Sequence, residues 1–262
     1  MPSLRLDTLE LHYEERGEGT PLVFLHGLGS RATDWEPQLA EFAKDYRCVA
    51  FDLPGSGQSI DRAHPHGPFT LESYAHSIAA AMRALNLVPA HVVGLSMGAM
   101  TGLQLALDAP DVVRSLTMVN ALASMQPRTF KDRFALGLRK LVTLTLGPRG
   151  VAKLVAPRLF PSPEHAHLRA GFVEQLSALD PRTYAAQSRA LLGWSVESRL
   201  SELRPPLTLI SADGDYTPVA AKHAIAARVP GAEVVVVPHT HHALPLEAPA
   251  AFNHALKERL TR

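Results

Sequence analysis

The sequence predicts an α/β protein with a mostly parallel sheet of eight strands, helices on both faces of that sheet, and a helical insertion after the sixth strand. Short apolar runs alternate with amphipathic segments along most of the 262 residues, which is typical of a doubly covered parallel sheet. This alternation stops between about Leu122 and Arg204, where only helical segments are expected. One predicted strand–helix junction holds a serine between two glycines, which indicates a nucleophile.

The first two predicted strands form an antiparallel pair, and the six that follow are short apolar runs that suit buried parallel strands. The expected strands are Leu4–Leu6, Leu9–Glu14, Leu22–Leu25, Cys48–Phe51, Val92–Leu95, Leu116–Val119, Leu207–Ser211 and Val234–Val237. The expected helices around them are Trp35–Lys44, Leu71–Leu85, Ala99–Ala109, Ala220–Val229 and Pro249–Leu260.

The insertion is predicted to be helical throughout. Its apolar residues Phe130, Phe134, Leu138 and Leu141 share one helical face, and Gly147-Pro148 and Pro157 interrupt the stretch that follows. Two more amphipathic helices are expected at His165–Leu179 and Pro181–Leu192, the second with proline in its first turn. We therefore expect a core domain of residues 1–121 and 205–262, and a helical cap of residues 122–204 that acts as a lid over the carboxyl edge of the sheet.

Composition excludes several classes of protein. The chain has 26 basic and 25 acidic residues, a net charge of +1 and no basic run interleaved with aromatic residues, so a nucleic-acid partner is not expected. Cys48 is the only cysteine, so no disulfide can form within the chain. The start lacks the basic and apolar pattern of a signal peptide, and no apolar run reaches membrane-spanning length. We expect a cytoplasmic protein, monomeric or homodimeric, without membrane contact.

The segment Gly94-Leu-Ser96-Met-Gly98 matches the G-x-S-x-G nucleophile elbow, in which a strand turns abruptly into a helix. Glycine is needed two residues before and two residues after the serine because larger side chains would collide across so tight a turn. The serine hydroxyl is then held at the carboxyl edge of the sheet, beside a helix N-terminus that favours negative charge.

A serine alcohol needs a base to take its proton and a third group to orient that base. Two loops after the last two predicted strands offer these groups. The first carries Asp213 and Asp215, and the second carries His239, His241 and His242. The spacing of these residues does not by itself choose between the two aspartates or among the three histidines.

Four ordered segments resemble the motifs of capped, serine-nucleophile α/β hydrolases. His26-Gly27-Leu28-Gly29 is similar to the family's HGxG loop, and Asp52 to Ser59 is similar to its DxxGxGxS loop. The elbow at Ser96 is the third match. The fourth runs from His242 through Glu247 to Pro249 and is similar to the closing H-x4-E-x-P segment, although His241 stands where the family usually has glycine.

The resemblance implies a catalytic triad of Ser96, Asp215 and His242, with the backbone N–H groups of Leu28 and Met97 as the oxyanion hole. Asp215 is preferred to Asp213 because the family's acid commonly follows a small strand-closing residue by three positions and shortly precedes a proline, as Asp215 follows Ala212 and precedes Pro218. By the same resemblance Asp52 organises its own loop, and His26 is a structural hydrogen-bonding residue.

The expected reaction is hydrolysis of carboxylic esters through an acyl-enzyme, without metal or other cofactor. The three neighbouring histidines do not suggest a metal site, because no carboxylate or cysteine joins them at ligand spacing. Hydrolysis of lactones, including enol-lactones, and of carbon–carbon bonds uses the same site and stays open, and a non-catalytic small-molecule binder is the alternative from another class. Pocket candidates in the cap region are Phe130, Phe134, Leu138 and Trp194.

Overall fold

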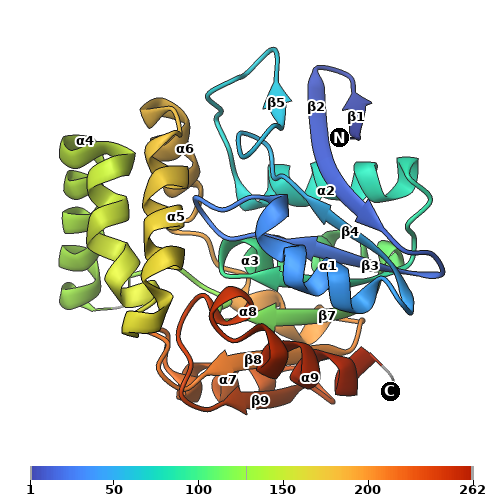
Figure 1. Ribbon diagram of the computed structural model, residues 1–262. Coiled ribbons are helices and arrows are strands. Elements are labelled where there is room, and N and C mark those ends of the chain that lie inside the picture. The colour runs from blue at the N-terminus through green and yellow to red at the C-terminus, as the bar shows by residue number, and fades with distance from the viewer. Residues whose placement is uncertain (1, 128, 261–262) are drawn as a thin grey trace.

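One twisted sheet forms the centre of the molecule (Figure 1). The structure is a computed structural model that describes residues 2–127 and 129–260. Within them nine strands have the order β1-β2-β4-β3-β6-β7-β8-β9, and β5 pairs with β2. The strands are β1 (Ser3–Leu6), β2 (Leu9–Arg16), β3 (Thr20–Leu25), β4 (Tyr46–Phe51), β5 (Ile60–Asp61), β6 (Ala90–Leu95), β7 (Val113–Val119), β8 (Leu207–Ala212) and β9 (Glu233–Val237).

The strand directions agree with the prediction. β1 is antiparallel to β2, and β2 is antiparallel to β4. From β4 across the sheet to β9, every neighbouring pair is parallel. All eight predicted strands are present, and the short β5 is an addition. Its two residues hold no apolar run, and the side chain of Ile60 is exposed, so sequence pattern could not reveal this strand.

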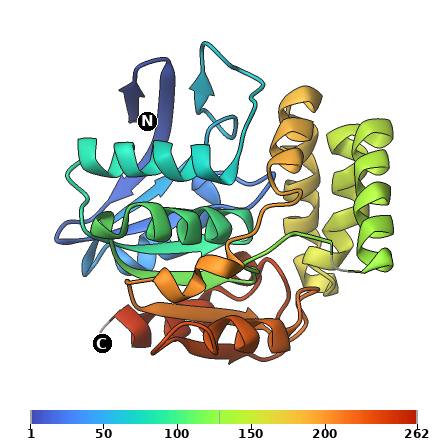
Figure 2. The same cartoon turned by 180° about the vertical axis from the view of Figure 1, so that it is seen from behind.

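Helices cover both faces of the sheet, as predicted (Figures 1 and 2). The α-helices are α1 (Glu36–Phe42), α2 (Leu71–Ala84), α3 (Met97–Asp108), α4 (Phe130–Leu159), α5 (Ala166–Ser177), α6 (Pro181–Ala190), α7 (Val219–Ala226), α8 (Leu244–Glu247) and α9 (Pro249–Leu260). Shorter 3₁₀ segments are η1 (Ala32–Trp35), η2 (Pro110–Val112), η3 (Pro163–His165) and η4 (Glu197–Glu202).

The alternation of side chains along the central strands produces two apolar cores. In β3, Val23 and Leu25 belong to a core shared with α2 and α3, whereas Leu22 and Phe24 belong to a core shared with α1 and α9. All four side chains are completely buried. A strand covered on both faces must be apolar at every position, which explains why these strands were recognised as continuous apolar runs.

The region between β7 and β8 contains α4, α5 and α6, which lie together beyond one end of the sheet (Figures 1 and 2). Helix α4 is broken at Gly147, whose positive φ of 61° lies outside the helical range, and Pro148 begins the second half. The break occurs where the Gly-Pro pair was expected to interrupt the helix. Helix α6 begins at Pro181 after the N-cap Asp180, whose side chain accepts hydrogen bonds from the first turn. Among the described residues, no helix combines the length and apolarity needed to cross a membrane.

Candidate active site

Ser96 lies at the junction of β6 and α3 in a backbone conformation that residues other than glycine rarely adopt, with φ 53° and ψ −113°. Its N–H donates to the carbonyl of Val119 in β7 at 2.9 Å. A Cβ added to Gly94 would lie 2.4 Å from the backbone of Gly98, and one added to Gly98 would lie 2.1 Å from the carbonyl oxygen of Leu25. Both glycines are therefore required by close backbone approach, as the elbow motif predicts.

We expect Gly98→Ala to destabilise the protein by about 2–3 kcal/mol or more, because the added methyl group meets backbone atoms that no side-chain rotation can move. Gly171→Ala is the matched control. Gly171 lies within α5 with nothing inside 4 Å of an added Cβ, and alanine favours a helix by up to about 1 kcal/mol. Urea unfolding measures both changes. An unchanged midpoint for Gly98→Ala would contradict the tight packing of this turn.

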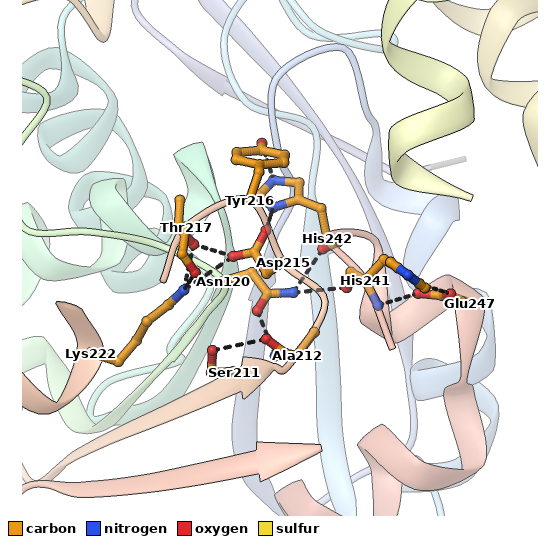
Figure 3. Close-up of polar contacts among 10 residues, drawn as sticks. All are labelled: Asn120, Ser211, Ala212, Asp215, Tyr216, Thr217, Lys222, His241, His242 and Glu247. Atoms are coloured by element: carbon orange, nitrogen blue, oxygen red, sulfur yellow. Dashed lines mark hydrogen bonds and ion pairs between the residues drawn. The ribbon is translucent and has the colours of Figure 1, made fainter. Parts of the chain in front are cut away.

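Asp215 and His242 meet on the loops that follow β8 and β9 (Figure 3). Asp215 Oδ1 lies 2.7 Å from His242 Nδ1, and the two side chains are 0% and 8% exposed. Burial acts to raise the pKa of Asp215, but hydrogen bonding and the charge of His242, together with Thr217 and Lys222, bring that pKa below its ordinary value. An ionised carboxylate here accepts the N–H of Nδ1, which leaves Nε2 as the nitrogen available to a reacting group.

The remaining acid and histidines of the two loops have other partners. Asp213 is exposed, and its Oδ1 accepts the backbone N–H of Thr240 at 3.3 Å. His241 Nδ1 lies 2.6 Å from Glu247 Oε1, and the His241 N–H donates to Glu247 Oε2 at 2.6 Å. His239 has a positive φ of 59° in the turn. In the part of the chain that the structure describes, no group of three or more His, Cys, Asp and Glu side chains could hold a metal ion.

Tyr216, which follows the acid directly, covers the outer side of His242 (Figure 3). Its hydroxyl lies 2.7 Å from His242 Nε2, and the two rings stack with centroids 4.1 Å apart at 26°. Among the described residues no hydrogen bond joins Ser96 Oγ to His242. Nothing in the sequence singles out Tyr216, because an aromatic residue in an exposed turn has no motif of its own.

Asn120, the residue after β7, ties the histidine loop to the sheet, and sequence analysis missed it. Its side-chain N–H groups donate to the carbonyls of His241 and His242 at 3.1 and 3.0 Å, and its Oδ1 accepts the N–H of Ala212 at 2.8 Å. The preceding carbonyl, that of Val119, accepts the N–H of Ser96. Val119, the last residue of β7, and the adjacent Asn120 thus fix the backbone of Ser96 and of His242, respectively. The sequence signal that could have identified Asn120 is an asparagine that directly follows an apolar strand.

The HGxG loop lies beside the serine. A Cβ added to Gly27 would be 3.5 Å from Ser96 Cβ, so the next residue, Leu28, starts close to Ser96. His26 holds this loop: its Nδ1 donates to the carbonyl of Gly27 at 2.8 Å, and its Nε2 accepts the N–H of Leu53 at 3.0 Å. Burial lowers the pKa of His26, so the ring is neutral and serves both bonds. His26 thus has the structural place that was expected.

The two predicted oxyanion donors lie on the HGxG loop and at the start of α3. Met97 is the first residue of α3, where backbone N–H groups have no partner within the helix. Leu28 follows Gly27, at which an added Cβ would lie 3.5 Å from Ser96 Cβ. That their N–H groups bind a developing oxyanion stays a prediction.

Asp52 organises the DxxGxGxS loop. Its Oδ1 accepts the N–H of Ala32 at 2.6 Å, and its Oδ2 accepts the N–H of Gln58 at 2.8 Å and lies 2.9 Å from His12 Nδ1. A Cβ added to Gly57 would lie 2.0 Å from the same Oδ2. These contacts use both oxygens of the carboxylate and tie its loop to η1 and β2. The buried His12 was not recognised, because a single histidine in an amphipathic strand carries no sequence signal.

The insertion rests on the loops around the site. On α5, Leu176 would be 2.8 Å from a Cβ added to Gly29, and Gln175 donates to the carbonyl of Gly29 at 3.2 Å. On α6, Gln187 donates to Ser56 Oγ at 2.8 Å. Phe160, just after α4, shares an apolar cluster with Ala243, the residue after the histidine. Three helices therefore contact three separate loops of the site.

Known proteins identify the family. The family described as alpha/beta hydrolase fold matches residues 20–249. The chain belongs to the α/β-hydrolase fold family. Two curated relatives of this hydrolase are named "Putative carbamate hydrolase RutD". The protein from Caulobacter segnis is 33% identical, with 93% of this chain and 94% of the relative covered. The protein from Azorhizobium caulinodans is 30% identical, with 98% and 97% covered.

Solved structures agree on the fold of this α/β hydrolase. An enol-lactonase from Burkholderia xenovorans superposes with a TM-score of 0.90 and 26% identity, with all of both chains covered. A thermophilic esterase from Thermogutta terrifontis gives a TM-score of 0.88 at 24% identity, with 100% of this chain and 98% of the esterase covered. The expected fold class is therefore confirmed.

The four pocket candidates of this hydrolase differ in burial. Phe130, Phe134 and Leu138 lie in the first half of α4 with 87%, 70% and 50% of their surface exposed. Trp194 is buried in the core shared with α3, where its indole N–H donates to Gln104 Oε1 at 2.9 Å. Helical spacing identified the apolar face of α4 but could not show that this face points outward. A role for these residues in substrate choice stays a prediction.

Proposed function

We propose that this α/β hydrolase cleaves carboxylic esters as a serine hydrolase, with Ser96 as nucleophile, His242 as general base and Asp215 as the group that orients the base. The observation that carries the proposal is the 2.7 Å contact between Asp215 Oδ1 and His242 Nδ1, on loops tied through β7 to the strained serine. Serine, histidine and acid in these roles form acyl-enzymes on several unrelated folds.

The proposed mechanism has two halves. His242 Nε2 takes the proton of Ser96 as Oγ attacks the acyl carbon, and the imidazolium then protonates the leaving alcohol. Water, activated by the same nitrogen, hydrolyses the acyl-enzyme. The N–H groups of Leu28 and Met97 would stabilise the oxyanion in both halves, and losing one such donor typically costs about 3 kcal/mol of transition-state stabilisation.

Tyr216 bears on the first step, since its hydroxyl lies at the nitrogen that must receive the serine proton. For His242 to act on Ser96, the phenol has to give up this hydrogen bond or the ring has to turn.

Two other substrate classes share this chemistry. Cleavage of a cyclic ester is favoured by the structural likeness to an enol-lactonase at 26% identity. Cleavage of a carbamate is favoured by relatives of about 30% identity or more that are named as carbamate hydrolases. Each substrate presents an acyl carbon to the serine, so the same three residues would serve all of them. No cofactor enters the proposed reaction.

A substrate panel tests the proposal. We expect p-nitrophenyl esters to be turned over with kcat/KM that rises over a few acyl carbons, at about 1 kcal/mol or somewhat more per methylene, and then falls as the pocket fills. A phosphonate should label Ser96 and no other residue.

Faster cleavage of a lactone or a carbamate would transfer the assignment to that class, and tight binding without turnover would favour a binding protein.

A further inference from the structure

A buried lysine lies against the carboxylate of Asp215, on the side opposite His242 (Figure 3). Lys222 Nζ in α7 is 3.1 Å from Asp215 Oδ2, and the two side chains are 1% and 0% exposed. Nζ also donates to the carbonyl and the hydroxyl of Thr217, and that hydroxyl donates to the same Oδ2. The three protons of an ammonium group thus have three acceptors, which is what a buried charged lysine needs.

The two oxygens of Asp215 therefore serve different partners: Oδ1 meets His242 and Oδ2 meets Lys222. Burial lowers the pKa of Lys222, and the attraction and hydrogen bond of Asp215 oppose that decrease. The other titratable groups nearby have different contacts. The Tyr216 phenol meets His242 Nε2, whereas Asp213 and Glu247 accept backbone N–H groups of the histidine loop.

We propose that Lys222 is a positioning residue that sets the basicity of the His242–Asp215 pair. A cation on Oδ2 withdraws part of the carboxylate charge from an imidazolium at His242 and also repels it directly, so removing the cation should favour the protonated ring. The same contact fixes the carboxylate so that Oδ1 points at Nδ1. This inference rests on the proposed role of His242 as the base.

Lys222→Met tests the inference because methionine retains the apolar stem and removes the charge. The acid limb of the kcat/KM–pH profile should move to higher pH by about half to one unit, so that activity below the midpoint falls about 3- to 10-fold while the plateau changes less. Lys153→Met, the same substitution at an exposed position of α4, should leave the limb in place. A Lys222→Met profile lowered equally at every pH, with an unmoved limb, would overturn the inference and leave Lys222 a structural role.

A measurement without substrate separates this inference from the proposed function. NMR titration of the His242 ring protons should show the same upward shift of the midpoint in Lys222→Met. If no acyl substrate is turned over, the proposed function fails, and this titration still decides the effect of Lys222. Should the variant not fold, ¹⁵N spectra of the wild-type protein decide: we expect a protected lysine ammonium signal at pH 7–8, and a neutral amine there would overturn the inference.

Discussion

Ser96→Ala should lower kcat/KM for p-nitrophenyl esters by about 10⁴-fold or more while the fold is retained. In the proposed mechanism Oγ of Ser96 forms the bond to the acyl carbon, and no neighbouring group can take its place. Any residual rate would come from binding and the oxyanion donors alone. Steady-state kinetics, with active-site titration to exclude wild-type contamination, measure the loss.

The fold of this variant is checked by its unfolding midpoint, which should equal or exceed that of the wild type. Mass spectrometry after phosphonate treatment should find one adduct on the wild-type protein, at Ser96, and none on Ser96→Ala. An adduct at another residue, or a variant that retains most of its activity, would defeat the assignment of the nucleophile.

Asp215→Asn should reduce kcat/KM by about 10³- to 10⁴-fold, because an amide at this position cannot hold His242 in the useful tautomer or stabilise its imidazolium. Asp213→Asn is the matched control, two residues away on the same loop. Its carboxylate is exposed and accepts a backbone N–H of the turn, a role that an amide oxygen can fill. A change of no more than a few-fold is therefore expected.

Comparing the two variants on one ester at several pH values decides between the aspartates. Similar losses in both, or a larger loss at Asp213, would show that the contact between Asp215 and His242 is not the one used in catalysis.

The fold could be predicted from the sequence because its strands are buried on both faces. Val23 and Phe24 point to opposite cores, yet both must be apolar, and such runs stand out among the amphipathic helices. The elbow could be predicted equally well, since a Cβ added at Gly94 or Gly98 would lie 2.4 or 2.1 Å from backbone atoms. Local steric demands of this kind leave a local pattern in the sequence.

The residues around the acid and histidine left no such pattern. Three side chains there act through tertiary contacts. Asn120 and Tyr216 contact His242, which lies far away in sequence, and Lys222 contacts Asp215 on the preceding loop. A lysine in a short helix is ordinarily interpreted as an exposed charge, and only the tertiary structure shows that Lys222 meets a carboxylate. Resemblance to a family was needed to choose Asp215, because its spacing alone did not separate it from Asp213.

The direction of the first half of α4 was also beyond the sequence. An apolar stripe such as Phe130, Phe134 and Leu138 predicts that a helix has one apolar face, but it does not show what that face packs against. In the structure these side chains point to solvent, and the contacts with the site loops come from α5, α6 and the end of α4.

Under the proposed mechanism, the left-handed backbone at Ser96 makes stability and turnover favour different residues at position 96. A serine held at φ 53° costs on the order of 1–3 kcal/mol, and glycine at the same position would carry little of that cost. Selection for thermal stability alone would therefore tend to replace the serine. In a library of variants sorted only by heat resistance, position 96 should drift to glycine. Where more stable descendants of the protein keep the serine, its retention indicates selection for turnover.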